Sequence, residues 1–308
     1  MSDGPLAALE ILGESRSGRA WESLPEIWDA YASERAAGRS PFAGAVRAAA
    51  GADRLAQAFA VGYPAALERL LPGVQLPSAL CATEAAGNSP RAIETTLRED
   101  GEGYRLSGTK TFVTFGSLAK TLIIVARAGL KADGRPEIVV VQIPAEREGV
   151  SVEELPPTPF VPEVVHARLE LDEVPVLGAE RLPGDGYLRY VKPFRTVEDI
   201  HVIGATLGYL VGWSRRVGPT AELLPELSSI LIALDALHDA EPLDPRVHVA
   251  LHGCLERLMG AVQGECFASL LAASGEAERG RWERDRSLLG IAGKARAARY
   301  DRAMQALS

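Results

Sequence analysis

The stretch CATEAAGNSP, which runs from Cys81 to Pro90, is the part of the sequence that decides the fold. It places threonine and serine hydroxyls in a loop that also contains glycine, asparagine and proline. Such a loop offers hydroxyl groups and free backbone N–H groups that can hold a polar ring edge or a phosphate. A plain turn after a strand accounts for the same residues, so both interpretations stay open at this point.

The segment after this loop predicts short β-strands. Asp100-Gly101-Glu102-Gly103 joins two strand-like runs, and Asp-Gly supplies the positive φ angles of a tight hairpin turn. In the last run, His166, Arg168 and Glu170 alternate with apolar residues and share the polar face. The predicted strands lie at 95–98, 104–107, 110–115, 121–126, 137–143 and 165–171. Many short strands at this spacing predict an antiparallel β-barrel or β-sandwich.

The regions on both sides of the strands have helical periodicity. Residues 17–71 repeat apolar side chains every three to four positions, and the chain after residue 195 does the same. The C-terminal pieces lie at roughly 195–216, 221–239, 245–274 and 283–307, which predicts a four-helix bundle. The fold class is therefore α+β, with a helical N-terminal domain (1–77), a middle β-domain (78–190) and the C-terminal bundle (191–308).

Composition excludes several classes of protein. The 308 residues include 47% hydrophobic and 24% charged side chains, as in an ordinary globular chain. The net charge of −8 opposes non-specific binding to nucleic acid, and no apolar run approaches the ~20 residues that span a bilayer. Three cysteines without a CxxC pair predict no disulfide framework. We expect a cytoplasmic protein with neither nucleic acid nor membrane as a partner.

A stripe of three glycines lies on the first predicted helix of the bundle. Gly204, Gly208 and Gly212 recur every four residues, so they share one helix face. Glycine inside a helix is unfavourable by ~1 kcal/mol relative to alanine, so the stripe needs an explanation. Close packing of another helix explains it, and so does contact with a flat ligand or an acyl chain.

Common motifs for nucleotides and metals are absent or weak. No GxGxxG fingerprint occurs, which counts against a Rossmann domain. His248, His252 and Glu256 share a predicted helix face, as metal ligands would, but there is no HExxH motif. A solvated polar face is the simpler interpretation, and we predict no metal site.

In combination, these segments resemble the middle domain of acyl-CoA dehydrogenases. The resemblance rests on the Thr-Glu…Gly-x-Ser loop, the hairpin, the strand Gly108-Thr109-Lys110…Thr114 and the run Asp172-Glu173-Val174-Pro175, over roughly 80–215. It implies the three-domain fold, a bound flavin adenine dinucleotide (FAD) and a homodimer or homotetramer. It also implies that a glutamate removes the α-proton of an acyl thioester while the β-hydride passes to the flavin.

The same resemblance implies which residues contact the flavin. Thr83 would contact the edge of the ring, with Ala82 beside it. Ser89 would lie near the flavin phosphate and the bound thioester. Phe112 replaces the usual tryptophan against the isoalloxazine, and Thr114 would hydrogen-bond the ring.

The sequence departs from the family pattern around the catalytic base. The usual loop that carries the base is largely missing at 274–280, and Arg215-Arg216-Val217-Gly218 is a degenerate form of the family's R-x-x-F-G motif. Glu198 stands where branched- and long-chain members place their base. A carboxylate facing an apolar pocket has a raised pKa, which suits a general base. The other interpretation is a carboxylate stabilised by the start of its helix.

Three hypotheses about function follow. The first is a shortened, divergent FAD-dependent dehydrogenase of an acyl thioester, bound to CoA or a carrier, with Glu198 as base and an unassigned electron acceptor. The second is a non-catalytic relative that acts as a subunit or an acyl- or flavin-binding partner of a full-length paralogue. The third keeps the flavin but uses another substrate, such as that of a monooxygenase.

Overall fold

The computed structural model describes residues 7–13, 21–218 and 223–308. The chain divides into two compact units. The helical unit consists of Met1–Arg69, Pro159–Glu163 and Thr196–Ser308, and the sheet unit of Leu70–Thr158 and Val164–Arg195. Residues 17–20 and 221–222, which belong to two predicted helices, lie outside the described residues.

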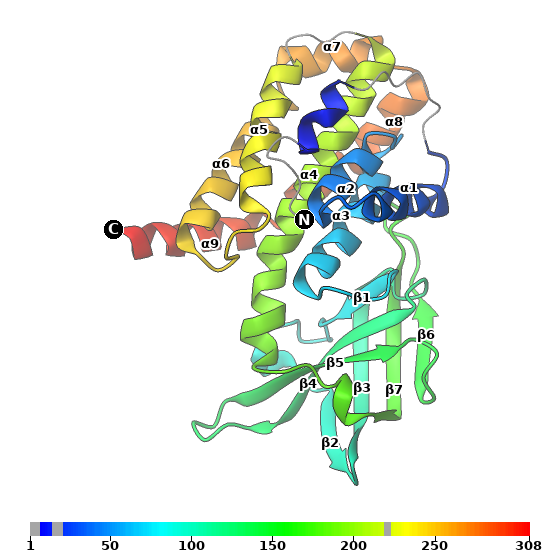
Figure 1. Cartoon of the computed structure of the whole chain (residues 1–308), viewed down its shortest axis with the longest axis vertical. Coiled ribbons are helices and arrows are strands. Elements are labelled where there is room, and N and C mark those ends of the chain that lie inside the picture. Colours follow the sequence, from blue (N-terminus) through cyan, green and yellow to red (C-terminus); the bar gives the residue numbers. More distant parts are fainter. Residues whose placement is uncertain (1–6, 14–20, 219–222) are drawn as a thin grey trace. The chain divides into compact units, whose positions relative to one another are not determined.

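The helical unit combines helices from both ends of the chain (Figure 1). Ser23, Ser40 and Asp244 cap three of them by accepting a backbone N–H, and each is followed within two residues by proline. The helices are η1 (Ala7–Leu12), α1 (Leu24–Ala36), α2 (Pro41–Ala49), α3 (Leu55–Leu70), α4 (Lys192–Val217), α5 (Leu223–Leu237), α6 (Pro245–Ala261), α7 (Glu265–Ala273), α8 (Glu276–Asp285), η5 (Arg286–Gly290) and α9 (Gly293–Leu307).

The C-terminal region is helical, as predicted, but its division differs. The prediction of one helix over 245–274 is wrong, because α6 ends at Ala261 and α7 starts at Glu265. Gly264 precedes α7 at its N-cap, and Gly275 does the same for α8. Glycine is a poor helix former, so these positions separate the segments. The predicted four pieces are six α-helices among the described residues.

The glycine stripe is a packing surface within the helical unit. A Cβ atom on Gly208 would collide with the backbone carbonyl of Val46 in α2. A Cβ atom on Gly212 would collide in the same way with the carbonyl of Ala50, directly after α2. The space in front of these glycines is therefore filled by another helix. The close-packing interpretation is confirmed, and contact with a ligand at these positions is excluded.

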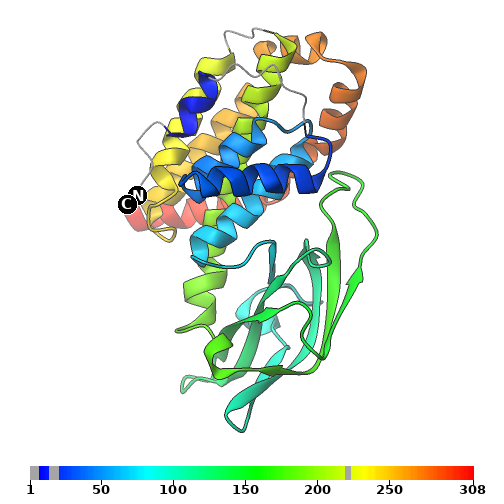
Figure 2. The same cartoon turned by 45° about the vertical axis from the view of Figure 1, so that its right-hand side comes forward.

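The sheet unit contains seven strands in one curled sheet (Figure 2). The strands are β1 (Ser78–Cys81), β2 (Thr96–Asp100), β3 (Gly103–Thr114), β4 (Thr121–Leu130), β5 (Pro136–Pro144), β6 (Val150–Glu154) and β7 (His166–Val176). Hydrogen-bonded neighbours follow the order β1-β4-β2-β3-β7-β6. β1 and β2 pair with successive parts of β4, and β5 pairs with β4 along its whole length. Short helical turns occur at η2 (Pro90–Ala92), η3 (Gly178–Glu180) and η4 (Tyr187–Val191).

The pairing of the strands confirms the hairpin and corrects the sheet type. Asp100 pairs with Gly103, and Gly101 has a φ of 61°, as the tight turn requires. The expectation of a purely antiparallel sheet is wrong, because β4 runs parallel to β1 and, at Thr96, to β2. The β2–β3 hairpin lies between β1 and β4 in the chain, and it makes the crossover that a parallel pair needs.

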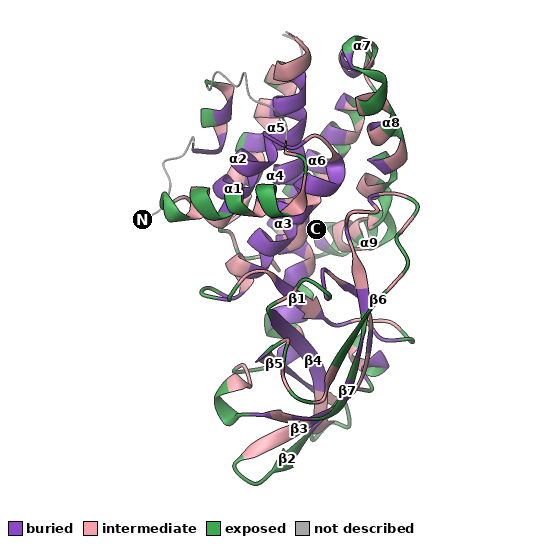
Figure 3. Cartoon of the chain, turned by 90° about the vertical axis from the view of Figure 1, so that its right-hand side faces the viewer, coloured by how far each residue is buried: buried purple, intermediate pink, exposed green. Residues whose placement is uncertain are grey.

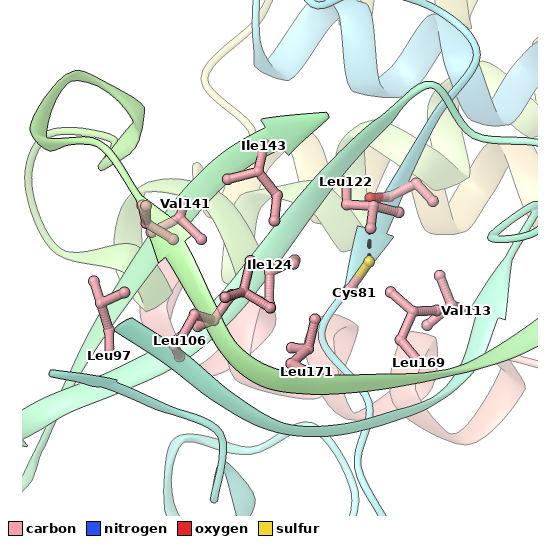
Figure 4. Close-up of a cluster of buried hydrophobic side chains, with 14 of the residues drawn as sticks. Cys81, Leu97, Leu106, Val113, Leu122, Ile124, Val141, Ile143, Leu169 and Leu171 are labelled. Atoms are coloured by element: carbon pink, nitrogen blue, oxygen red, sulfur yellow. Dashed lines mark hydrogen bonds between the residues drawn. The ribbon is translucent and has the colours of Figure 1, made fainter. Parts of the chain in front are cut away.

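The core of the sheet unit lies on the concave face predicted from alternation. Ala167, Leu169 and Leu171 are buried, whereas Arg168 and Glu170 are exposed. Figure 3 shows the same contrast between buried β4 and exposed β6. The core includes Cys81, Leu97, Leu106, Val113, Leu122, Ile124, Val141, Ile143, Leu169 and Leu171 (Figure 4). Burial raises the pKa of Cys81 to about 12, so this thiol is a core residue and not a nucleophile.

No helix among the described residues is both long enough and apolar enough to cross a membrane.

Candidate functional site

A buried ion pair fixes the loop that follows β1. The Nζ atom of Lys110 on β3 lies 2.5 Å from Oε1 of Glu84, and their side chains are 0% and 7% exposed. The Glu84 carboxylate also accepts backbone N–H groups from Glu94 at 2.7 Å and Thr95 at 3.1 Å. Glu84 therefore joins the start of the loop to its end and to β3.

The two charges of this pair stabilise each other against burial. Burial alone raises the pKa of Glu84, but the ion pair with Lys110 and the hydrogen bonds outweigh it, so the pKa is lowered. Burial lowers the pKa of Lys110, and Glu84 offsets part of that change. Removing either partner would leave a buried charge without its counter-ion, which is strongly unfavourable.

The fixed loop and β3 border a hollow of about 850 Å³. The N–H of Thr111 on β3 donates to the carbonyl of Thr83 at 2.9 Å, so the loop lies directly against the strand. We call this cavity the Thr83 hollow. Its lining includes Thr83, Glu84, Ala85, Gly87, Thr95, Thr109, Thr111, Phe112 and Arg168.

Phe112 is the most unusual residue of the hollow. Its φ is 50°, in the left-handed region that aromatic residues rarely adopt, and its side chain is 62% exposed. The β3–β7 register shifts between Lys110 and Val113, so Phe112 lies in a bulge. Its ring makes an edge-to-face contact with His166, with centroids 6.1 Å apart. Backbone strain combined with an exposed aromatic ring is typical of a functional site.

The other predicted flavin contacts lie outside this hollow. Ala82 is buried, Thr114 is half-buried, and neither lines the cavity. Ser89 is exposed and lines a second hollow of about 340 Å³, together with Arg91, Lys131 and Arg135. The structure thus brings Thr83 and Phe112 to one hollow and places Ser89 at a separate hollow of the same unit, where Lys131 pairs with Asp185.

Glu198, the predicted base, belongs to the helical unit. It is half-buried and lies six residues after Lys192, the first residue of α4, so the helix start does not explain it. Its neighbour Asp199 is buried and accepts hydrogen bonds from Arg296 at 2.8 Å and from Arg299. The acidic residue after Glu198 is therefore neutralised by two arginines from α9.

Comparison with known proteins agrees with this fold. Residues 79–174 match the family described as "Acyl-CoA dehydrogenase, middle domain". The middle part of the chain is thus similar to the middle domain of acyl-CoA dehydrogenases. A segment of 66 residues is 35% identical to a 3-(aryl)acrylate reductase from Clostridium sporogenes. That segment spans 21% of this chain and only 17% of the reductase.

Solved structures of other proteins share the fold at low sequence identity. A glutaryl-CoA dehydrogenase from Mycobacterium smegmatis, in complex with FADH2, is 15% identical over 87% of this chain and 80% of its own, with a TM-score of 0.64. The prolyl acyl carrier protein oxidase AnaB is 16% identical over 86% of this chain and 84% of its own, with a TM-score of 0.64. At this identity the likeness shows the fold alone.

Two arginines that resemble the family's R-x-x-F-G motif take part in packing of this chain. Arg216 donates to the carbonyl of Ala50 at 3.1 Å and to that of Ala52 at 2.6 Å. Arg215 donates to the carbonyl of Ile11. The two bonds of Arg216 satisfy carbonyls directly after the C-terminus of α2, where a cation is favourable, and the bond of Arg215 satisfies a carbonyl of η1. The acyl-CoA dehydrogenase motif is here part of the helix packing.

The segment that replaces the family's base loop is the start of a helix. Glu276 and Glu278 lie in the first turn of α8, and Glu276 is exposed. The N–H of Gly275 donates to Oε2 of Glu278 at 3.2 Å, so this carboxylate caps the helix. Both acidic residues suit the positive end of a helix dipole.

The two helix histidines that resembled metal ligands have other contacts. His248 Nε2 lies 2.9 Å from the carbonyl oxygen of Pro242, and the His252 ring stacks on Tyr300 with centroids 4.0 Å apart. Across the described parts of the chain, no three His, Cys, Asp or Glu residues lie close enough to hold a metal ion.

FAD is the cofactor that the family implies, and the residues of the Thr83 hollow fit its isoalloxazine ring. The exposed Phe112 ring offers a flat apolar surface, with Thr83 and Thr111 beside it. Thr95 also lines the hollow, and its buried hydroxyl lacks a hydrogen-bond partner among the described residues. A planar ligand with polar edges requires this combination of groups.

Sequence reasoning missed the Glu84–Lys110 pair and the contact of His166 with Phe112. A lysine in a strand is ordinarily exposed, so nothing marked Lys110 as buried. The alternation of 165–171 did place His166 on the outer face of β7. Its contact with Phe112 depends on the bulge in β3, which has no local signal.

Proposed function

We propose that this protein is an FAD-dependent oxidoreductase that dehydrogenates an acyl thioester between its α and β carbons. The observation that carries the proposal is the Thr83 hollow, where a strained and exposed Phe112 stands beside the loop of Thr83. The glutaryl-CoA dehydrogenase and the acyl carrier protein oxidase that share the fold support this class of substrate.

In this proposal, the sheet unit binds the cofactor. Phe112 packs against the isoalloxazine, Thr83 and Thr114 hydrogen-bond its edges, and Ala82 lies beside it. The Glu84–Lys110 pair keeps the loop of Thr83 against β3, which holds these contacts in place before the cofactor binds. When bound, FAD supplies the acceptor for the hydride that leaves the β-carbon.

Glu198 is the proposed base. Its carboxylate takes the α-proton as the β-hydride leaves, so the thioester loses one proton and one hydride and gains a carbon–carbon double bond. Asp199 keeps its charge paired with Arg296 and Arg299, so it is not available for this step. The proton is assigned to Glu198 because the family resemblance places the base at this position of α4.

The hollow at Ser89 is the proposed site for the flavin phosphate and the phosphate groups of the bound thioester. Arg91 lines it with Ser89, and a guanidinium binds phosphate, whereas Lys131 and Arg135 are paired with Asp185 and Asp133. Coenzyme A and the phosphopantetheine of a carrier protein both carry phosphate. Comparing an acyl-CoA with the same acyl group on a carrier protein distinguishes the two substrates.

The experiment has two parts with separate outcomes. Purified protein mixed with FAD should retain a yellow, flavin-like absorbance after gel filtration, and colourless protein would refute the proposal. Turnover of acyl thioesters with an artificial electron acceptor then tests the base. Glu198→Gln should abolish turnover and retain FAD, whereas Glu256→Gln, at an exposed position of α6, should leave turnover unchanged. Wild-type rates in Glu198→Gln would remove Glu198 from this role.

A second function is favoured by specific departures from the family. Arg216 is engaged with α2, and the segment of the base loop forms α8. These features suit a non-catalytic subunit or an acyl- or flavin-binding partner of a full-length paralogue. FAD binding without turnover of any thioester, together with copurification of a full-length dehydrogenase, would support this function over the first.

We also propose a cytoplasmic homodimer or homotetramer, as the family resemblance implies. Light scattering of the purified protein tests the assembly, and a mass of 32.8 kDa, that of one chain, would contradict it.

A further inference from the structure

We infer that His166 is a flavin-contact residue that presents its imidazole beside Phe112 to the bound ring. The inference rests on the proposed function, because it assigns one more residue to the same cofactor site. His166 lies in β7, outside the Thr83 loop and the strand that carries the other predicted contacts.

The register of the sheet places His166 among the proposed flavin contacts. His166 pairs directly with Thr114 across the β3–β7 ladder. Ala167, the next residue, is buried in the core, so the His166 side chain is on the outer face. On that face its ring meets the ring of Phe112 edge to face. The histidine is thus adjacent to two residues that we assign to the ring.

The surroundings of His166 orient its imidazole and keep it neutral. Burial lowers the pKa of His166, and a hydrogen bond to the backbone of Val164 opposes this in part. The ionisable side chains on the same face are Arg168 on β7, which pairs with Glu170, and Glu153 on β6, which lies opposite Arg168. On β3 its neighbours Phe112 and Thr114 carry no charge.

A neutral imidazole has chemistry that the other contacts lack. One ring nitrogen donates a hydrogen bond and the other accepts one, whereas protonation converts both into donors. With one nitrogen bonded to Val164, the other can accept an N–H from the isoalloxazine. Protonation in acid would remove this acceptor and place a positive charge beside the ring.

The test follows the visible spectrum and affinity of bound FAD as a function of pH. Wild-type protein should show one spectral transition below pH 6.5, the ordinary pKa of histidine. His166→Gln and His166→Phe should both lose this transition. His166→Phe keeps a ring against Phe112 but has no acceptor, so its FAD affinity at neutral pH should fall about fivefold. Circular dichroism checks that both variants are folded.

The control and the alternative outcomes separate this inference from the proposed function. His252→Gln alters a histidine of the helical unit and should retain the transition. If wild-type protein binds FAD but the transition is missing, or persists in both His166 variants, the inference is wrong and the proposed function stands. If wild-type protein binds no FAD, both are wrong.

Discussion

Helix α4 and strand β3 each contain a locally unfavourable feature. In α4 it is glycine inside a helix, and in β3 it is the positive φ of Phe112, but the surroundings of the two features differ. On α4, three glycines face helix α2, which fills the space in front of them. On β3, Phe112 has a strained backbone, and its ring faces an open hollow. A disfavoured residue therefore indicates packing where a neighbour fills the space, and a binding site where the space is open.

A large loss of stability is expected when a side chain is placed in the glycine stripe. Gly212→Leu would push a side chain into the backbone of Ala50, and we expect a loss of ~3 kcal/mol or more in the free energy of unfolding. Trp21, Trp28, Trp213 and Trp282 all lie in the helical unit. Tryptophan fluorescence during urea unfolding therefore measures this effect.

Gly253 provides the matched control. It lies inside α6 with open space around it, so Gly253→Ala should raise stability by ~0.5–1 kcal/mol. Equal stability of Gly212→Leu and wild-type protein would show that the stripe is not a packing surface.

An effect of similar size concerns the buried pair that supports the hollow. Lys110→Met leaves the Glu84 carboxylate buried without its counter-ion, and should destabilise the sheet unit by ~3–5 kcal/mol. Hydrogen exchange at the backbone amides of β3 and β7 follows this unit, which contains no tryptophan. The double variant Glu84→Gln/Lys110→Met should recover part of the loss. A double variant no more stable than Lys110→Met would contradict the role of the unpaired charge.

The stability of the helical unit should also depend on pH, because α4 contains a buried histidine, His201. Burial lowers the pKa of His201 from 6.5 to about 3. The unfolded chain therefore takes up a proton below pH 6.5, whereas the folded chain stays neutral down to about pH 3. The stability contributed by neutral His201 is present above pH 6.5 and is lost as the pH falls.

When the pH is lowered from 7 to 5, protonation of His201 in the unfolded chain should lower the free energy of unfolding of the helical unit by ~2 kcal/mol. Urea midpoints from tryptophan fluorescence at both values measure it. His201→Gln cannot titrate, so its loss over the same range should be smaller by about that amount. An equal loss in both proteins would show that His201 is not buried in its neutral form.

The smallest effect on stability is expected at Phe112, where binding and stability should change in opposite directions. Phe112→Gly removes the strain of a φ of 50° and should stabilise the sheet unit by ~1 kcal/mol. The same variant loses the ring and should bind FAD about tenfold more weakly. A variant that is less stable than wild-type protein would contradict the strain at this position.

Local patterns were sufficient to predict much of the fold. Asp100-Gly101 marked the hairpin, and the alternation of 165–171 separated the buried Leu169 from the outward His166. The predicted start of a helix at residue 245 is also correct, because Pro245 is the first residue of α6. Each of these signals acts within a few residues, so it can be identified without knowing the rest of the structure.

The remaining features depend on contacts between segments far apart in the sequence. The parallel pairing of β1 with β4 has no local signal, and the predicted sheet type was wrong for that reason. The glycine stripe had two explanations until α2 was placed against it. Within the site, Thr83 and Phe112 line the same hollow, and their contact with a flavin stays a prediction, whereas the buried state of Lys110 follows only from Glu84 on another segment.

The most direct test of the account is titration of the purified protein with FAD, followed by flavin fluorescence. We predict saturable binding by wild-type protein, weaker binding by Phe112→Ala, and unchanged binding by Leu177→Ala, whose side chain is 61% exposed but lies outside the Thr83 hollow. Absence of saturable binding by wild-type protein, or equal binding by Phe112→Ala, would contradict the assignment of this hollow to the flavin.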